Sequence, residues 1–132
     1  MLKCTIWCRR VMSRKVLVVD DEQEIVDFME RFLIRKGISV VKAGNGDIAV
    51  EICKKEMPDC VFLDIQLPGK DGIDTLIELK QINPLIKVIM ITGKDDLSFK
   101  EKAAQAGALD YITKPLDLSE LNQKIQTYIL NV

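Results

Sequence analysis

The sequence predicts an α/β fold: one doubly wound, five-stranded parallel sheet with helices on both of its faces. The chain has 132 residues, of which 48% are hydrophobic, and this is enough for one packed core in a single domain. Short runs rich in valine and isoleucine alternate with segments whose apolar residues recur at helical spacing. Five such strand–helix units are present, which is too few for an eight-stranded barrel.

The first strand is expected over residues 16–19, a continuous apolar run typical of a strand buried on both faces. The helix that follows has an apolar face and is closed by Gly37. Its expected inward side chains are Ile25, Phe28, Met29, Phe32 and Leu33. Residues 38–41 are expected to form the second strand, and residues 47–56 the second helix. The expected inward side chains of this second helix are Ile48, Val50, Ile52 and Cys53.

Pro58 ends the second helix, and the third strand is expected over residues 60–63, ending on Asp64. Asp71 is placed to cap a third helix, which stops at Pro84. The expected inward side chains of the third helix are Ile73, Leu76, Ile77 and Ile82.

The fourth strand is expected over residues 88–91. Ser98-x-x-Glu101 has the form of a capping box for a fourth helix that runs to Gly107. A short fifth strand is expected over residues 109–113, and Asp117-x-x-Glu120 then caps the last helix. The expected buried stripe of that helix is Leu118, Leu121, Ile125, Tyr128 and Ile129. Because crossovers between parallel strands are right-handed, the flavodoxin-like strand order 2-1-3-4-5 is the leading topology.

We expect residues 1–13 to form an N-terminal extension and residues 14–132 to form the domain. The extension contains the only tryptophan but shows no clear period, and it lacks the pattern of a secretory signal. Met12 would make a natural start for the domain. The preceding segment is expected to be either frayed or docked on the surface.

Composition excludes several classes of function. The 19 basic and 20 acidic side chains give a net charge of −1, so no direct nucleic-acid binding is expected. No apolar run approaches the roughly 18 residues that span a membrane. The sequence has no histidine, which excludes Ser-His-Asp relays and histidine-based zinc sites. Cys53 and Cys60 lie among apolar residues, and Cys4 and Cys8 form no disulfide framework, so a reducing cytoplasm is expected.

Polar residues end four of the five expected strands. Asp20 and Asp21 follow the first strand, Asp64 the third, Thr92 the fourth and Lys114 the fifth. In a parallel sheet of this order, ligands bind at the carboxyl ends of the strands, beside the point where strand order reverses. Each residue alone is weak evidence of a site, but together they predict three carboxylates, a hydroxyl and an ammonium at one edge of the sheet.

Three crowded carboxylates raise one another's pKa unless a cation neutralises them. Mg²⁺ prefers oxygen ligands from one or two carboxylates with waters and phosphate oxygens, so Asp20, Asp21 and Asp64 suggest a magnesium site. A carboxylate such as Asp64 can attack phosphorus and form an acyl phosphate. Lys114 would then balance the phosphoryl charge, and Thr92 could donate a hydrogen bond to a phosphoryl oxygen.

From Arg14 to Asn131 the sequence resembles the receiver domain of two-component response regulators. The resemblance lies in four segments and in their spacing: VLVVDDE (16–22), VFLDIQLPGKDG (61–72), VIMITG (88–93) and DYITKP (110–115). It implies that Asp64 accepts a phosphoryl group from a sensor histidine kinase or a phosphotransfer protein. It also implies that Asp20 and Asp21 hold Mg²⁺ together with Asp64 and the main-chain carbonyl of Gln66.

The resemblance further implies that Thr92 is the switch hydroxyl, that Lys114 is the motif lysine, and that Lys114-Pro115 is a cis peptide. Tyr111 falls on the aromatic switch position, whose side chain turns inward when the threonine is drawn toward the phosphoryl group. Such a protein is a signalling switch that catalyses only its own phosphorylation and dephosphorylation. Its downstream protein target is expected to bind the face formed by the fourth helix, the fifth strand and the fifth helix. Gln66 and Lys94 are individual to this chain and could set the lifetime of the acyl phosphate.

Two rival interpretations use the same architecture. A nucleotide- or flavin-binding module would need a phosphate-cradling loop after the first strand, where Asp20 and Asp21 stand instead. A phosphatase with an aspartyl nucleophile would need an acidic residue where Gln66 lies. A further alternative concerns the whole protein: the chain either works alone or is the receiver fragment of a longer response regulator or hybrid kinase.

Overall fold

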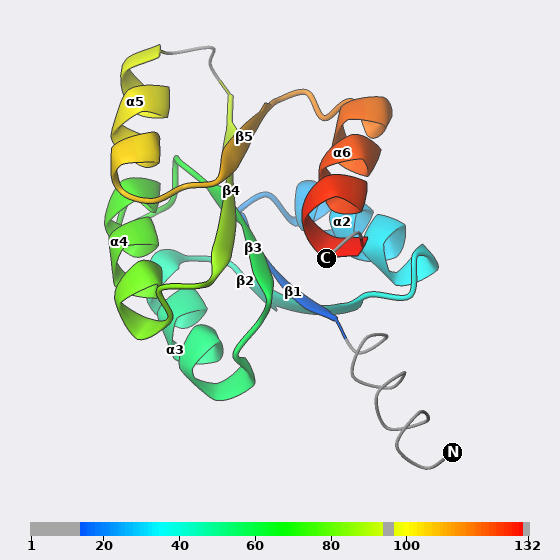
Figure 1. Cartoon of the computed structure of the whole chain (residues 1–132), viewed down its shortest axis with the longest axis horizontal. Coiled ribbons are helices and arrows are strands. Elements are labelled where there is room, and N and C mark those ends of the chain that lie inside the picture. Colours follow the sequence, from blue (N-terminus) through cyan, green and yellow to red (C-terminus); the bar gives the residue numbers. More distant parts are fainter. Residues whose placement is uncertain (1–13, 94–96, 131–132) are drawn as a thin grey trace.

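The computed structural model describes residues 14–93 and 97–130, and these residues build one parallel sheet (Figure 1). Its order is β2-β1-β3-β4-β5 and every neighbouring pair is parallel, which confirms the predicted topology. The strands are β1 (Lys15–Val19), β2 (Ser39–Ala43), β3 (Cys60–Asp64), β4 (Lys87–Thr92) and β5 (Asp110–Thr113). The predicted N-terminal extension, with Cys4, Cys8 and Met12, lies outside the described residues, as does Lys94.

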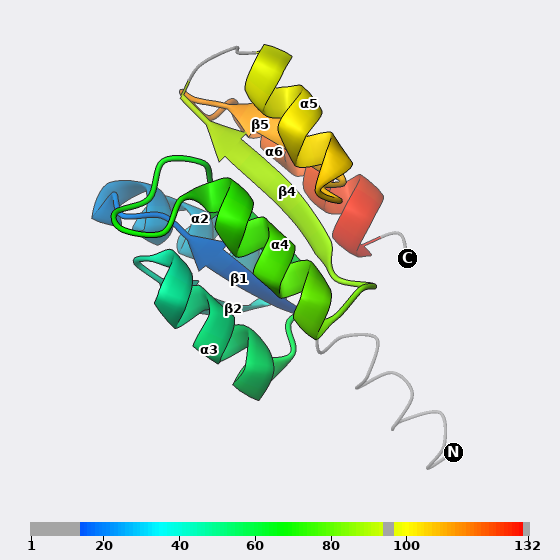
Figure 2. The ribbon, with the colours of Figure 1, turned by 90° about the vertical axis from the view of Figure 1, so that its left-hand side faces the viewer.

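Helices cover both faces of the sheet, as predicted (Figures 1 and 2). They are α2 (Gln23–Arg35), α3 (Gly46–Glu56), α4 (Gly72–Ile82), α5 (Leu97–Gln105) and α6 (Leu118–Ile125), which the π-helical turn η1 (Gln126–Leu130) continues. The helices α3, α4 and α5 pack on one face, and α2 and α6 pack on the other. Among the described residues, no helix combines the length and the apolar character that a membrane span requires.

Alternate residues of β1, β3 and β4 feed two separate cores. Leu17, Val61 and Met90 point toward α3, α4 and α5, whereas Val18 and Phe62 point toward α2 and α6. All five residues of β3 are buried, so both faces of this central strand are covered. This explains why the strands read as continuous apolar runs rather than as alternating patterns. The free thiols of Cys53 and Cys60 are buried, as predicted for cysteines acting as small hydrophobes.

Three side chains that were predicted to point inward are exposed: Ile48, Ile77 and Leu118. In α3 the buried face contains Ala49 instead, and in α4 it contains Leu79. These helices lie on one face of a sheet and bury a narrow stripe, so an isoleucine beside the stripe stays in solvent.

The capping prediction at Ser98 is also wrong, because α5 begins at Leu97 and places Ser98 inside the helix. The side chains of Asp71 and Asp117 cap α4 and α6 as predicted, accepting from the amides of Asp74 and Ser119.

The start of α4 lies directly against the end of β3, and a glycine permits this close approach. The Gly72 amide donates to the carbonyl oxygen of Ile65 at 2.9 Å. A Cβ atom at Gly72 would lie 2.5 Å from the Asp64 carbonyl oxygen and 2.6 Å from the Ile65 Cα. Both contacts are to backbone, which cannot move without displacing the strand end that carries Asp64.

The substitution Gly72→Ala is therefore expected to destabilise the fold, at a cost of roughly 1 to 3 kcal/mol typical of overpacking. Gly44→Ala is the matched control, because nothing lies within 4 Å of a Cβ atom at Gly44. Urea denaturation measures both free energies of unfolding. Equal midpoints for the two variants would contradict this account of the β3–α4 junction.

Candidate functional site

The predicted site residues stand at the carboxyl ends of four neighbouring strands. Asp20 directly follows β1, Asp64 ends β3, Thr92 ends β4, and Lys114 directly follows β5. Because the strands are parallel, these residues share one edge of the sheet. Two backbone hydrogen bonds extend the pairing beyond the ladders: the Asp20 amide donates to the Ala43 carbonyl at 3.2 Å, and the Lys114 amide to the Thr92 carbonyl at 2.7 Å.

Lys114 lies at the centre of the site. Its Nζ is 3.2 Å from Asp20 Oδ2, 3.2 Å from Asp64 Oδ2 and 2.9 Å from Glu22 Oε1. The side chain of Asp20 is fully buried and that of Asp64 is 5% exposed, so the ammonium compensates two carboxylates that are largely removed from water. The Lys114-Pro115 bond is cis, in agreement with the resemblance to receiver domains.

Backbone amides orient the two buried carboxylates. Asp20 Oδ1 accepts a hydrogen bond from the Glu22 amide at 2.9 Å, and Asp64 Oδ1 accepts one from the Gln66 amide at 3.1 Å. In both cases an aspartate at a strand end caps the turn that follows it. The second oxygen of each carboxylate is thereby left facing Lys114.

The environment of Asp64 changes its acidity. Burial, and then the charge of Asp20, raise the pKa of Asp64 to about 6, although the Gln66 amide and Lys114 oppose this change. Burial alone would lower the pKa of Lys114, but its hydrogen bond to Glu22 and the charges of Asp64 and Asp20 outweigh burial and raise it. Near neutral pH the Lys114 side chain is therefore cationic, and Asp64 is ionised at an energetic cost.

Four carboxylates at this edge could hold a metal ion. Asp20, Asp21, Glu22 and Asp64 each offer an oxygen, and these oxygens lie within 4.8 Å of one another. Asp20 Oδ2 is buried and accepts no hydrogen bond from the described residues, although Lys114 forms an ion pair with it. A buried, negatively charged oxygen without a donor fits a hard cation, and an all-oxygen donor set suits a divalent ion such as magnesium or calcium.

Glu22 was missed by the sequence analysis. Its carboxylate belongs to the acidic cluster and also accepts a hydrogen bond from Lys114. The signal was its position directly after Asp20-Asp21 at the end of the first strand. The structure places Gln66 at the site through its amide and leaves its side chain exposed.

Thr92 and Tyr111 both line a small cavity. Thr92 is buried, whereas Tyr111 is 38% exposed with the Nζ of Lys100 4.0 Å from its ring centroid. The cavity has a volume of about 170 Å³, and its lining includes Thr92, Tyr111, Met90, Lys100 and Ala103. A void therefore lies next to Tyr111 and next to Thr92 at the end of β4.

The family of this chain follows from comparison with known proteins. Residues 16–126 match the sequence model of the response regulator receiver domain, so the chain belongs to the response regulator receiver family. It is similar to the sporulation initiation phosphotransferase F of Bacillus subtilis, with 34% identity over 90% of this chain and 96% of that protein. It is also similar to the alkaline phosphatase synthesis transcriptional regulatory protein PhoP of the same organism, with 36% identity. That alignment covers 89% of this chain but 49% of PhoP, so the chain spans about half the length of that relative.

Solved structures support the same assignment. A CheY-like response regulator receiver domain protein from Methanospirillum hungatei aligns with a TM-score of 0.85 and 29% identity, covering 89% of this chain and 94% of that one. A response regulator protein from Burkholderia pseudomallei, solved with a phosphorylated aspartic acid, a calcium ion and citrate, aligns with a TM-score of 0.80 and 25% identity. The shares covered are 87% of this chain and 68% of that one.

Membership of this family defines the class of function. Receiver domains are phosphoacceptor modules of two-component systems, and they act as signalling switches rather than as classical enzymes. They interact with histidine kinases or phosphotransfer proteins and typically use a divalent metal. This favours the predicted receiver over the rival flavin-binding module and the rival phosphatase.

From the raised pKa of Asp64 we predict how the stability of the folded state depends on pH in the absence of divalent cations. Because the folded-state pKa of about 6 exceeds the ordinary value of 3.8, the folded state loses stability as pH rises through this interval. Asp64→Asn removes this cost, so its melting temperature is expected to exceed that of the wild type by several degrees near pH 7.5. The difference should shrink toward pH 4, where the carboxyl group is largely protonated in both states. Thermal unfolding across this range measures the difference, and a gap that is independent of pH would contradict the assigned environment of Asp64.

Proposed function

We propose that Asp64 accepts a phosphoryl group from a sensor histidine kinase or phosphotransfer protein, with Mg²⁺ bound at the acidic cluster. The observation that carries the proposal is the position of Asp64: it is buried at the end of β3, with Lys114 3.2 Å from one of its oxygens. Asp20 and Asp21 offer oxygens within the same cluster. The phosphorylated aspartic acid and the calcium ion of the Burkholderia pseudomallei structure support the same chemistry for this chain.

In the proposed reaction, an oxygen of the Asp64 carboxylate forms a bond to phosphorus. The bond between phosphorus and the imidazole nitrogen of the donor breaks, and that nitrogen keeps the electron pair. Phosphoryl transfer depends mainly on alignment and on charge stabilisation, so one carboxylate and one ammonium are the chief requirements of the chain. Lys114 offsets the charge that reaches the site. In the separate dephosphorylation step, water attacks phosphorus and the bond between phosphorus and the Asp64 oxygen breaks, which releases inorganic phosphate and restores the carboxylate. We assign no other catalysis to the domain.

The metal has a defined place in this proposal. We assign Asp20, Asp21, Asp64 and the main-chain carbonyl of Gln66 as its ligands. A bound Mg²⁺ supplies positive charge that neutralises the crowded carboxylates and attracts phosphoryl oxygens. The buried Asp20 Oδ2, which no described residue satisfies by a hydrogen bond, supports this assignment.

Thr92 and Tyr111 are proposed to convert phosphorylation into a change of shape. The Thr92 hydroxyl would donate a hydrogen bond to a phosphoryl oxygen and draw the end of β4 toward Asp64. The cavity of about 170 Å³ beside Thr92 gives the ring of Tyr111 a place to enter from its half-exposed position. A partner that prefers one of the two arrangements then senses the phosphorylation state.

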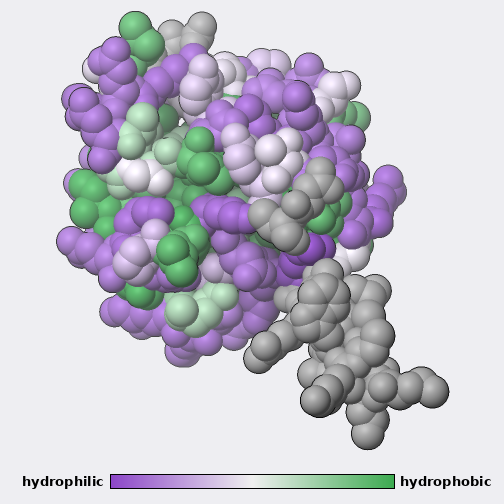
Figure 3. Space-filling model, in the orientation of Figure 1, coloured by the Kyte–Doolittle hydropathy of each residue, from purple (hydrophilic) through white to green (hydrophobic). Residues whose placement is uncertain are grey.

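The downstream target is proposed to bind the face formed by α5, β5 and α6. Three leucines at or directly before the starts of these elements are exposed by 46% to 69%, namely Leu97, Leu109 and Leu118, and Tyr111 of β5 is exposed as well. In Figure 3, apolar surface in green lies among the purple hydrophilic surface on the side where β5 runs between α5 and α6. The target is either a separate protein or another part of a longer response regulator or hybrid kinase. The half-length match to PhoP supports the second alternative, and the nearly full-length match to phosphotransferase F supports the first.

We propose that the domain works in the cytoplasm. The buried thiols of Cys53 and Cys60 are unpaired, which suits a reducing compartment.

Incubation with acetyl phosphate and Mg²⁺ is expected to add one phosphoryl group to the wild-type protein and none to Asp64→Asn. Asp74→Asn is the matched control, because Asp74 is exposed in the first turn of α4 and is not a member of the acidic cluster. Intact-mass spectrometry measures the gain, and a chelator should abolish it. Equal phosphorylation of wild type and Asp64→Asn would overturn the assignment of the phosphoacceptor.

A further inference from the structure

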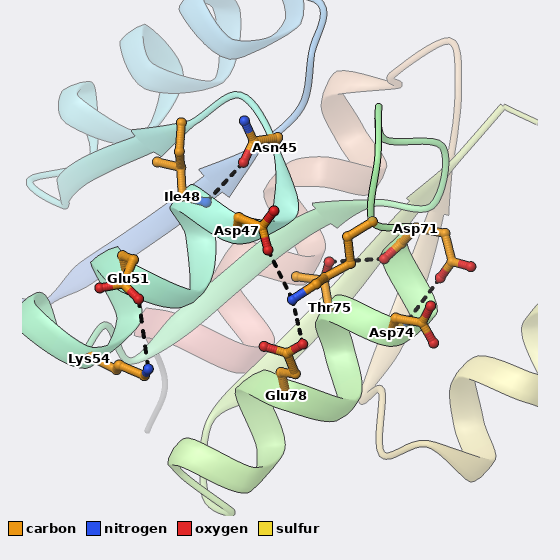
Figure 4. Close-up of polar contacts among 10 residues, drawn as sticks. Asn45, Asp47, Ile48, Glu51, Lys54, Asp71, Asp74, Thr75 and Glu78 are labelled. Atoms are coloured by element: carbon orange, nitrogen blue, oxygen red, sulfur yellow. Dashed lines mark hydrogen bonds and ion pairs between the residues drawn. The ribbon is translucent and has the colours of Figure 1, made fainter.

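Lys70 joins the loop that follows Asp64 to two helices. Its Nζ lies 3.1 Å from Asp47 Oδ1 on α3, and it also forms an ion pair with Glu78 Oε1 on α4. Figure 4 labels the two acidic partners, Asp47 and Glu78. The side chain of Lys70 is 21% exposed, whereas those of Asp47 and Glu78 are 81% and 41% exposed. The hydrogen bonds to Glu78 and Asp47 raise the pKa of Lys70, so its ammonium stays charged.

The stem of Lys70 packs where α3 begins. A Cβ atom at Gly46 would lie 3.3 Å from the Cδ of Lys70 and 2.2 Å from Thr75 Oγ1. Glycine at this position therefore lets the lysine stem and α4 approach the first turn of α3. Thr75 Oγ1 donates to the Asp71 carbonyl at 2.9 Å, which fastens the end of the loop to α4. The contacts of Lys70 thus combine two carboxylates with a fitted apolar stem.

The same loop carries a backbone group of the functional site. At its start, the Gln66 amide donates to Asp64 Oδ1, and at its end the Gly72 amide donates to the Ile65 carbonyl. Between them, Gly69 adopts a φ of 77°, a conformation that glycine tolerates best. The loop thus turns sharply in the middle, and Lys70 ties its second half to α3 and α4.

We propose that Lys70 is a positioning residue that holds the β3–α4 loop in the conformation in which the Gln66 main chain faces the acidic cluster. In this way Lys70 sets the affinity of the site for Mg²⁺, an inference that rests on the proposed function. Ion pairs with solvent-exposed partners contribute little to overall stability. Losing the two ion pairs of Lys70 with Asp47 and Glu78 should therefore barely affect global unfolding. It should instead lower the fraction of molecules with an ordered loop, and apparent affinity falls in proportion to that fraction.

Lys70→Met tests the proposal, because methionine keeps an apolar stem but removes the ammonium. Lys70→Arg keeps the charge and is the rescue variant. Lys54→Met is the matched control, since Lys54 is an exposed lysine of α3 that pairs with Glu51 at 3.7 Å. Three quantities are measured: hydrogen exchange of the Gln66 amide in metal-free protein, the Mg²⁺ dissociation constant by calorimetry, and the melting temperature.

In Lys70→Met the Gln66 amide is expected to exchange about fivefold faster, and the Mg²⁺ dissociation constant to rise about three- to tenfold. The melting temperature should change by less than about 3 °C, and Lys70→Arg and Lys54→Met should resemble the wild type.

Unchanged exchange and unchanged Mg²⁺ affinity in Lys70→Met, beside normal binding by the wild type, would overturn this inference alone. A large fall in melting temperature with no selective change at Gln66 would overturn it as well, because it would show a merely structural role. Failure of the wild type to bind Mg²⁺ would overturn the proposed metal site and, with it, the role of Lys70 in metal affinity.

Discussion

The contact between Lys114 and two buried aspartates is the interaction on which the rest of the site depends. Two carboxylates in a poorly solvated position repel each other, and Lys114 Nζ lies 3.2 Å from an oxygen of each. One ammonium does not fully compensate this charge, because burial and Asp20 still raise the pKa of Asp64 to about 6. The site is therefore short of positive charge. Such a site favours a divalent cation and, once that cation is bound, favours the transfer of a phosphoryl group whose charge the cation and Lys114 share.

The fold keeps these groups together by burying the strands that carry them. The central strand β3 is covered on both faces, so the backbone at Asp64 is held by two hydrophobic cores. Polar contacts also hold the loop beyond the end of β3, namely the hydrogen bond from the Gln66 amide to Asp64 and the ion pairs of Lys70. A rigid sheet edge with adjustable loops suits a switch, because a small change of charge can alter the loops without disturbing the core.

The architecture could be predicted from the sequence because strand and helix periods alternate clearly and because parallel connections are right-handed. That topology also predicted that Asp20, Asp64 and Lys114 lie together, because each stands at the carboxyl end of a parallel strand. The details that failed depend on tertiary contacts. Ile48 and Ile77 are apolar but flank a narrow buried stripe, and nothing local distinguishes them from core residues. The ion pairs of Glu22 and Lys70 could not be predicted because their partners are distant: Lys114 is far from Glu22 in sequence, and Asp47 and Glu78 lie on separate helices.

The central claim is that the acidic cluster forms one cation site. Titration with Mn²⁺, followed by NMR, tests it most directly, because a paramagnetic ion broadens the signals of nuclei close to it. The account predicts that the amide signals of Asp20, Asp21, Asp64 and Gln66 broaden first, and that an excess of Mg²⁺ restores them. Broadening centred elsewhere, or none at these four amides, would contradict it.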